Sequence, residues 1–243
     1  MTIRPILTIA LTGMLSLVSI NKLAATDKAT LLDLQSLLAG EHRSENNIAR
    51  DNWRNPLETL TFFGLRKDMT VIEMWPGSGR YYTEILAPLL RDNGLYFAAN
   101  FDINETSFEA FNSIKYFANK NIERPDLYDK MIVTAFSDKV TTIAPPNSAD
   151  LVLTFRNIHN FTINGYVEKF FTAMHTALKP GGILGVVEHR GNPEVQQDPR
   201  GMSGYINQDY AIQLAEAAGF VFVEASEINA NPKDIKEYPE GVW

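Results

Sequence analysis

Two glycines lie where a predicted strand gives way to a predicted helix, and their spacing is the first feature that suggests chemistry. The stretch 70–84 reads TVIEMWPGSGRYYTE, with β-forming residues before Gly77 and Gly79 and helically spaced apolar residues after them. Glycines in such a turn let a ligand approach the backbone, and the following helix offers free N–H groups. The pattern predicts a nucleotide or phosphate site.

The residues around the turn narrow the choice of ligand. A dinucleotide fingerprint requires a third glycine where this chain has Tyr82, and no Gly-Lys-Ser/Thr follows to make a P-loop. Glu73, just before the turn, would repel phosphate but could hold an ammonium group or a water beside a ribose. These features favour a cationic nucleoside without phosphates, such as S-adenosylmethionine. A tight strand–helix turn in another kind of α/β protein stays open as the alternative.

An acidic residue ends the next predicted strand, 95–101. Asp102 stands where a carboxylate can accept hydrogen bonds from the ribose hydroxyls of a bound nucleoside. The same residue could instead cap a helix that runs through Phe108 and Phe111. The two roles are compatible, and the sequence leaves both open.

Polar side chains also follow the predicted strands 149–155 and 183–187. The carboxyl ends of parallel strands meet at one edge of a sheet, where ligands bind in open α/β folds. We therefore expect these side chains to line the mouth of a site that holds a polar substrate. The set comprises Arg156, Asn157, His159, Glu188, His189 and, from a later loop, Tyr205.

His159 is the candidate catalytic residue, because an imidazole can take up a proton near neutral pH. A structural or substrate-orienting role is the alternative. Grouped with Glu188 and His189 it also raises a metal site, but the sequence shows no ligand spacing to support one, so no metal is expected.

The elements that must position these residues alternate between strand and helix, which predicts a parallel, doubly wound α/β sheet. Helices preceding the sheet are expected to cover its edge or the ligand mouth, with a polar stretch, 41–55, between them. The expected helices are 27–38, 57–63, 80–90, 166–178 and 211–218, and the expected strands are 70–75, 95–101, 131–136, 149–155, 183–187 and 220–225.

Composition excludes several classes of protein. The chain has 243 residues, a net charge of −7 and no cysteine. It therefore has neither a thiolate metal site nor a disulfide, and it lacks the clustered basic residues of a nucleic-acid-binding protein.

The first residues resemble a secretory signal peptide. Arg4 precedes an apolar stretch, 6–20, and the small residues Ala24 and Ala25 suit cleavage after position 25. An uncleaved anchor is the alternative, although the stretch is short for a membrane span. We expect a periplasmic or secreted protein without a stable membrane span once the leader is removed. The predicted organisation is a signal peptide (1–25), an N-terminal helical cover (26–64) and the α/β domain (65–243).

Several motifs between about 57 and 228 resemble the class I S-adenosylmethionine-dependent methyltransferases. VIEMWPGSG stands where that superfamily has an acid followed by a glycine motif, and AANFD where its second strand ends in an acid. ALKPGGILGVVEH, the most specific match, stands at the turn into the fifth strand, and EAAGFVFVEA at the sixth. More narrowly, the chain is similar to a bacterial, often exported, group of predicted methyltransferases.

The resemblance implies a Rossmann-like fold of methyltransferase type and S-adenosylmethionine as cofactor. It implies that Glu73, Gly77 and Gly79 face the methionine part, Asp102 the ribose and Asp138 the adenine. The chain departs from the superfamily pattern in two ways. Trp75 and Pro76 replace the first motif positions, where an indole could stack on the ligand or block it. Between the predicted sixth strand and Trp243, no segment is a candidate for the antiparallel seventh strand of that superfamily.

The function expected from this resemblance is methyl transfer to a small or envelope-associated acceptor. A non-catalytic nucleoside- or small-molecule-binding protein on the same fold is the runner-up. A nicotinamide-dependent oxidoreductase is the third reading, disfavoured by the missing glycine. The expected partner is a small-molecule substrate, without nucleic acid.

Overall fold

The computed structural model describes residues 25–77, 79–104 and 107–243. The expected signal peptide, apart from Ala25, lies outside the described residues. Among the residues described, no helix is both long enough and apolar enough to cross a bilayer.

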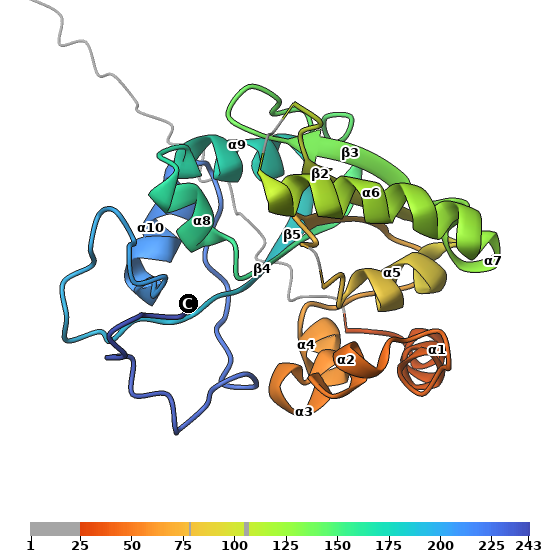
Figure 1. Ribbon diagram of the computed structural model, residues 1–243, viewed down its shortest axis with the longest axis horizontal. Coiled ribbons are helices and arrows are strands. Elements are labelled where there is room, and N and C mark those ends of the chain that lie inside the picture. The colour runs from red at the N-terminus through yellow and green to blue at the C-terminus, as the bar shows by residue number, and fades with distance from the viewer. Residues whose placement is uncertain (1–24, 78, 105–106) are drawn as a thin grey trace, which may run out of the picture.

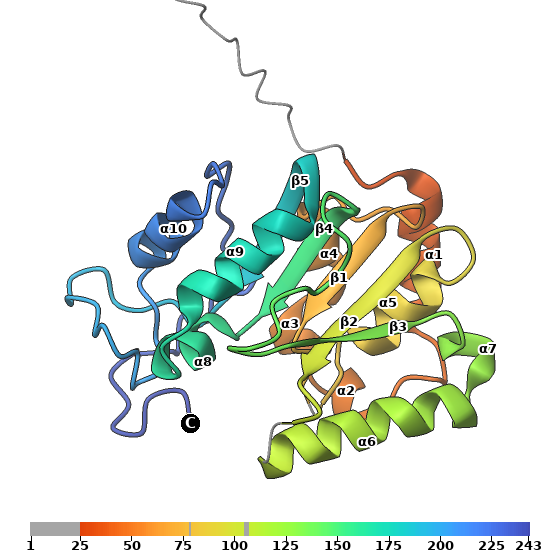
Figure 2. The same ribbon diagram turned by 90° about the horizontal axis from the view of Figure 1, so that it is seen from above.

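The core of the fold is a five-stranded, all-parallel sheet with the strand order β3-β2-β1-β4-β5 (Figures 1 and 2). This confirms the predicted doubly wound α/β architecture. The chain builds outward from β1 to β3 and then returns to the other side of β1, so the strand order reverses between β1 and β4. Ligands of open α/β sheets bind in the crevice at such a reversal. The strands are β1 (Thr70–Met74), β2 (Leu95–Phe101), β3 (Ile132–Phe136), β4 (Ala149–Phe155) and β5 (Leu178–Val187).

Helices cover both faces of the sheet, as parallel strands require. One face carries α1 (Lys28–Leu38), α4 (Pro56–Phe62), α5 (Thr83–Leu90), α6 (Phe108–Glu123) and α7 (Pro125–Tyr128). The other carries α8 (Ile158–Ile163), α9 (Val167–Ala177) and α10 (Gln208–Ala217). In Figure 1, α1 to α4 gather below α5, and α10 and the C-terminal segment lie on the opposite side of the view.

Strand β1 shows how the sequence divides between these two layers. Alternate side chains of a strand point to opposite faces. Val71 accordingly packs in the cluster beneath α5, whereas Ile72 and Met74 pack in the cluster beneath α9. All of them are fully buried, so β1 is a central strand and its end is held rigidly in the crevice.

In the N-terminal cover, the two predicted helices form as α1 and α4, but the segment between them has more structure than the sequence predicted. Asp27 caps α1 by accepting a hydrogen bond from the backbone N–H of Thr30 (2.9 Å). The stretch 41–55, described from the sequence only as polar, contains two short helices, α2 (Glu45–Ile48) and α3 (Asp51–Arg54). These helices lack the apolar periodicity on which the prediction relied, and they are held instead by polar contacts to the site described below.

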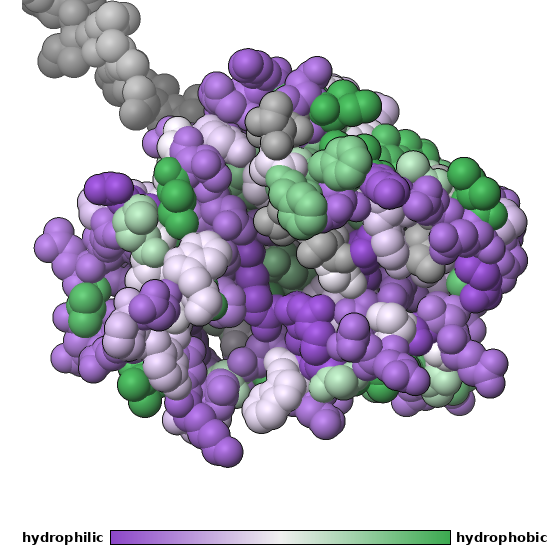
Figure 3. All heavy atoms as spheres, in the orientation of Figure 1, coloured by the Kyte–Doolittle hydropathy of each residue, from purple (hydrophilic) through white to green (hydrophobic). Residues whose placement is uncertain are grey.

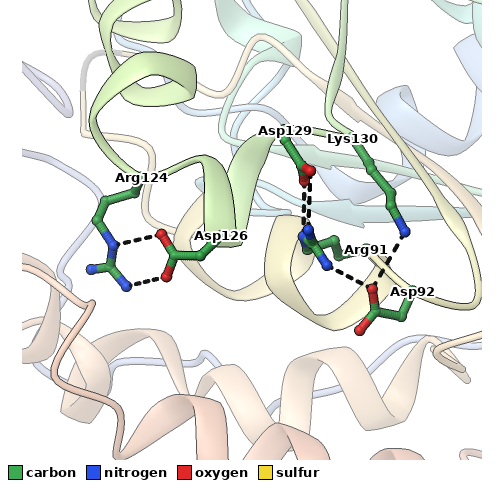
Figure 4. Close-up of polar contacts among 6 residues, drawn as sticks. All are labelled: Arg91, Asp92, Arg124, Asp126, Asp129 and Lys130. Carbon is green, nitrogen blue, oxygen red and sulfur yellow. Dashed lines mark hydrogen bonds and ion pairs between the residues drawn. The ribbon is translucent and has the colours of Figure 1, made fainter.

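Exposed ion pairs join the end of α5 to the turn before β3 (Figure 4). Arg91 donates to both carboxylate oxygens of Asp129 (2.8 and 3.0 Å) and also contacts Asp92. Lys130 reaches the same Asp92, and Arg124 pairs with Asp126. Such exposed pairs each contribute little stability, and they lie at the end of the sheet away from the site.

The predicted sixth strand does not form. Residues 220–225 have no strand hydrogen bonds, and Val221 and Val223 are more than half exposed. Strand propensity is expressed only where a neighbouring strand accepts the backbone hydrogen bonds. Here β5 pairs with β4 alone, and a groove of about 1820 Å³ separates it from this segment. In the space-filling view a small opening lies at the lower left of the molecule (Figure 3).

Strand β5 is longer than predicted, because the strand begins before the Lys-Pro-Gly-Gly turn. Ala149 pairs with Leu178 and Leu151 pairs with Ile183, so the intervening residues bulge out of the ladder. A bulge of this kind bends the strand locally and ends regular pairing on one side.

Gly185 of β5 should tolerate no side chain. A Cβ there would lie 2.7 Å from a methyl carbon of Leu153 and 2.8 Å from the ring of Phe63. Glycine-to-alanine substitutions in unstrained backbone usually stabilise a protein, but overpacking a core costs about 1–3 kcal/mol. We expect Gly185→Ala to lower the free energy of unfolding in urea by that amount. Thr172→Ala on the exposed side of α9 is the control and should change it little.

Candidate functional site

The glycine turn after β1 is open at Gly77 and is contacted by the N-terminal cover at Gly79. Gly77 has a φ of +68°, and the nearest atom to a Cβ built there is the Trp75 carbonyl oxygen at 3.9 Å. The carbonyl oxygen of Gly79 accepts a hydrogen bond from the side-chain amide of Asn47 (2.8 Å). A Cβ on Gly79 would approach Nη1 of Arg50 to 3.0 Å. Helix α2 and the residues after it therefore hold the turn, while Gly77 leaves room for a ligand.

Trp75 lies across the carboxyl ends of β2 and β3. Its φ of +39° turns the side chain over the sheet, and its indole N–H donates to the carbonyl oxygen of Phe136 (3.0 Å). Its ring centroid is 4.2 Å from that of Phe101 and 4.4 Å from that of Phe161. A nucleoside bound over these strand ends must stack on the indole or displace it.

Glu73 lies beneath the turn and is almost completely buried. Its carboxylate accepts hydrogen bonds from the hydroxyl groups of Tyr96 and Thr83, the latter at 3.0 Å. Burial raises the pKa of Glu73 to about 7, against the lowering effect of those hydroxyl groups and of the nearby Arg54. The carboxylate thus braces the first turn of α5, and its predicted contact with the methionine part stays a prediction.

Asp102 is buried at the end of β2 and is already hydrogen-bonded. It accepts from the backbone N–H of Asn104 (3.0 Å) and from the hydroxyl of Ser137 (3.1 Å). The Asn104 hydrogen bond, with the help of Ser137, lowers its pKa, so it is ionised at neutral pH. The alternative role as a helix cap is wrong. Helix α6 begins at Phe108, and the Ser107 hydroxyl accepts the first-turn N–H.

Asp138 stands apart from Asp102. Its side chain is 56% exposed and pairs with Lys169 on α9, whose ammonium group also donates to the Asp138 carbonyl oxygen (3.1 Å). The turn after β3 thus contributes the Ser137 hydroxyl to the cluster around Asp102. The predicted role of Asp138 beside an adenine remains a prediction.

Glu188 organises the second group of residues, at the ends of β4 and β5. One oxygen accepts from the backbone N–H of Ile158 (2.7 Å), and the other lies 2.9 Å from Nδ1 of His159 and accepts from the N–H of His189 (2.8 Å). Because an ionised carboxylate can only accept, Nδ1 of His159 carries the proton. Nε2 is therefore the nitrogen that can take up a second proton. The Trp243 ring covers this imidazole at 5.2 Å between centroids.

His189 and Tyr205 extend this group toward the groove. Burial lowers the pKa of His189 to about 4, although Glu188 opposes the shift, so the imidazole is neutral at pH 7. Tyr205, with its ring centroid 6.4 Å from that of His189, donates its hydroxyl hydrogen to Asp234 (2.7 Å). Burial and this bond raise the pKa of Tyr205, which stays protonated.

Asn157 joins the two groups. Its side-chain amide donates to the carbonyl oxygen of Met74 (2.9 Å), which ties the end of β4 to the end of β1. Arg156, just before it, has a φ of +61°, and its Nη1 is buried without a hydrogen-bond partner among the described residues. Arg156 and His189 border the groove beside β5, so this group, rather than the glycine turn, faces the large cavity.

No group of three or more histidine or acidic residues with metal-binding geometry occurs in the part of the chain that the structure describes. Glu188, His159 and His189 are instead engaged in hydrogen bonds with one another and with the backbone.

The sequence allowed the N-terminal cover to lie over the ligand mouth, but it did not identify the residues that reach the site. These residues are Asn47 on α2, Arg50 just before α3 and Arg54 on α3. The only feature of this stretch that could have pointed to the site was its three arginines, at positions 43, 50 and 54, in a segment without apolar periodicity.

Comparison with known proteins supports the fold. The chain is similar to the crystal structure of an S-adenosylmethionine-dependent methyltransferase from Aquifex aeolicus, with 19% identity over 70% of this chain and 82% of that chain, and a TM-score of 0.52. It also resembles an arsenic(III) S-adenosylmethionine methyltransferase from Chlamydomonas reinhardtii, with 18% identity, a TM-score of 0.44, and coverage of 63% of this chain and 52% of that one. No protein-family model and no curated protein matches the sequence.

The first of these similarities establishes the class of fold. Together with the parallel strand order, it shows that the sheet is Rossmann-like and of the kind found in S-adenosylmethionine-dependent methyltransferases.

The buried Glu73 should make stability depend on pH. Its pKa is about 7 in the folded protein against an ordinary value of 4.5, so the folded state binds the proton more tightly. Its contribution is therefore complete below about pH 4.5 and is lost as the pH rises through about 7. The loss amounts to at most about 3 kcal/mol.

We expect Glu73→Gln to remove this part of the pH dependence, measured as the free energy of unfolding in urea between pH 5 and pH 8. The difference between the wild-type and variant curves isolates Glu73 from the other titrating groups. Glu58→Gln, on the exposed side of α4, should follow the wild-type curve. Parallel curves for Glu73→Gln and the wild type would contradict the burial argument.

Proposed function

We propose that this protein is an S-adenosylmethionine-dependent methyltransferase that acts on a small or envelope-associated acceptor. The observation that carries the proposal is a histidine oriented by a buried carboxylate, His159 on Glu188, at a strand end joined to the glycine turn of a methyltransferase-type sheet. In this proposal, His159 is the proton acceptor and the glycine turn after β1 is the cofactor site. This arrangement gives no particular support to a non-catalytic binding protein.

The residues around the turn fit the cofactor in outline. The space beside Gly77 admits a ligand against the backbone, and the ionised Asp102 can exchange its bond to Ser137 for a ribose hydroxyl. Trp75 offers an aromatic surface for an adenine. Gly79, Glu73 and Asp138 are assigned to the same site by resemblance. S-adenosylmethionine would supply an electrophilic methyl group there.

The chain's own residues would then orient and deprotonate the acceptor. Methyl transfer is an in-line displacement, so its rate depends mainly on the position of the attacking atom. Nε2 of His159 would take the proton from an oxygen or nitrogen nucleophile while Glu188 stabilises the resulting imidazolium. Arg156, His189 and Tyr205 border the groove from which an acceptor could enter. Asn157 holds the two strand ends at a fixed separation.

We also propose that the protein is exported. The supporting observation is the signal-like sequence 1–25, and this assignment would place it with the exported group of predicted methyltransferases. An acceptor in the cell envelope follows from that location, and the net charge of −7 disfavours a nucleic-acid substrate.

Calorimetric titration tests the cofactor. We expect the protein to bind S-adenosylmethionine in preference to NAD, and Asp102→Ala to weaken binding several-fold because a ribose hydrogen bond is lost. Asp92→Ala, at an exposed acid of the same charge, is the matched control and should bind as the wild type does. Absence of binding by folded wild-type protein would refute the proposed function. Unchanged affinity in Asp102→Ala would remove only the ribose assignment.

Transfer of a radiolabelled methyl group from S-adenosylmethionine to the small-molecule and envelope fractions of a bacterial extract tests catalysis. We expect His159→Gln to slow transfer by about 10²–10⁴-fold while cofactor affinity stays the same, since general base catalysis contributes that much. His175→Gln on the exposed side of α9 provides the control. Equal rates in the wild type and His159→Gln would exclude His159 as the base.

A further inference from the structure

Three arginines meet beside the glycine turn without a carboxylate partner. Arg50 and Arg54 both lie over the ring of Tyr81, at 5.4 and 5.0 Å from its centroid. Arg156 directly follows β4, and its charge acts on both Arg54 and Tyr82. The Tyr82 ring stacks on Phe155, the last residue of β4, at 3.5 Å between centroids. Among the described residues, none of the three arginines forms an ion pair.

A fourth arginine, Arg43, lies over the same Tyr81 ring and does form an ion pair. It donates two hydrogen bonds to Asp51 (2.6 and 2.8 Å). Asp51 further accepts from the Tyr81 hydroxyl, so its acceptor capacity is committed. The structural need for a counter-charge is thus met at Arg43. Among the described residues, the other three guanidinium groups have no ion-pair partner.

The surroundings of Arg54 and Arg156 make their charges costly. Burial, together with the charges of Arg156 and Arg50, lowers the pKa of Arg54 to about 10. Burial also lowers the pKa of Arg156, with Arg50 adding to the shift. The nearest acids compensate only in part. The charge of Glu188 opposes the lowering of the Arg156 pKa, and the charge of Arg54 acts on Glu73, but neither acid forms an ion pair with these arginines. Glu188 accepts from three N–H donors and Glu73 from two hydroxyl groups. Desolvated like charges of this kind are stabilised by an anion that bridges them.

The cofactor alone would not supply enough negative charge. S-adenosylmethionine carries a sulfonium and an ammonium group against one carboxylate, so its net charge is positive at neutral pH. Its approach to three guanidinium groups that lack ion-pair partners among the described residues is unfavourable unless another anion is bound. We propose that Arg50, Arg54 and Arg156 bind an anionic group of the methyl acceptor, a carboxylate or a phosphate, beside the glycine turn. The identity of this ligand as an acceptor rests on the proposed function.

Inorganic phosphate is the probe for the anion site. In calorimetric titrations of the whole chain, we expect saturable binding of phosphate that is at least about tenfold weaker in Arg54→Gln and in Arg156→Gln, since each removes a charge-assisted hydrogen bond. Arg91→Gln makes the same change in net charge at an exposed, paired arginine, and it should bind phosphate within about twofold of the wild type. Binding that is absent from the wild type, or equal in Arg54→Gln, would overturn the proposal.

Titration with S-adenosylmethionine separates an acceptor anion from the cofactor's own carboxylate. If the arginines serve the acceptor, Arg54→Gln binds S-adenosylmethionine at least as tightly as the wild type, and phosphate still binds when the cofactor is present. If phosphate competes with S-adenosylmethionine, and Arg54→Gln weakens the cofactor but not its decarboxylated analogue, the cluster holds the cofactor and the acceptor assignment is overturned.

Urea unfolding tests whether Arg54 has a purely structural role. If Arg54 is repelled by its neighbours, the Arg54→Gln variant should unfold at the same or a higher urea concentration than the wild type. If Arg54 instead stabilises the fold, the variant should unfold at a lower urea concentration. The phosphate experiment needs no cofactor. Phosphate binding that depends on the arginines, in a protein that binds no S-adenosylmethionine, would therefore refute the proposed function and leave the anion site standing.

Discussion

The carboxylate of Glu188 is the interaction on which the candidate site depends. It receives three N–H donors, from the first residue of α8, from the His159 imidazole and from the backbone of His189. A single side chain thus fixes where α8 begins, which nitrogen of His159 carries its proton, and how β5 leaves the sheet. Because the carboxylate is buried, each of these bonds is stronger than it would be in water.

The remainder of the site is joined to this carboxylate through backbone groups. Asn157 ties the end of β4 to the carbonyl oxygen of Met74, and Trp75 ties the same end of β1 to the carbonyl oxygen of Phe136. The ends of β1, β3 and β4 therefore form one rigid rim. From the other side, the N-terminal cover grips the glycine turn through Asn47. A site with these properties has little freedom to rearrange, which suits a reaction governed by the position of the attacking atom.

Charge is distributed unevenly around this rim. Acidic groups near the turn are committed to hydrogen bonds within the protein. Among the described residues Arg50, Arg54 and Arg156 form no ion pair, although Arg50 donates to the side-chain oxygen of Asn47 (3.1 Å). The chain carries an overall negative charge, so this local excess of positive charge is a property of the crevice and not of the surface as a whole. An acidic surface with a basic crevice favours a small anionic ligand over a nucleic acid.

The alternation of strands and helices was sufficient to predict the parallel sheet, because buried strands and amphipathic helices carry local, periodic signals. The same reasoning placed Asp102, Arg156, His159 and His189 at strand ends. It could not show that Trp75 would lie across the neighbouring strands, since that depends on a left-handed backbone and on distant aromatic rings.

What the sequence determined by itself is the architecture and the edge of the sheet at which polar residues gather. The tertiary structure decided how those residues are paired: Glu188 with His159 and Asp102 with Ser137. It leaves Arg54 and Arg156 without an ion pair to any acid among the described residues. It also decided that residues 220–225 remain outside the sheet despite their strand-like pattern. The physical reason is that periodicity is a local property of the chain, whereas hydrogen-bond partners, counter-charges and strand edges are supplied by segments far away in the sequence.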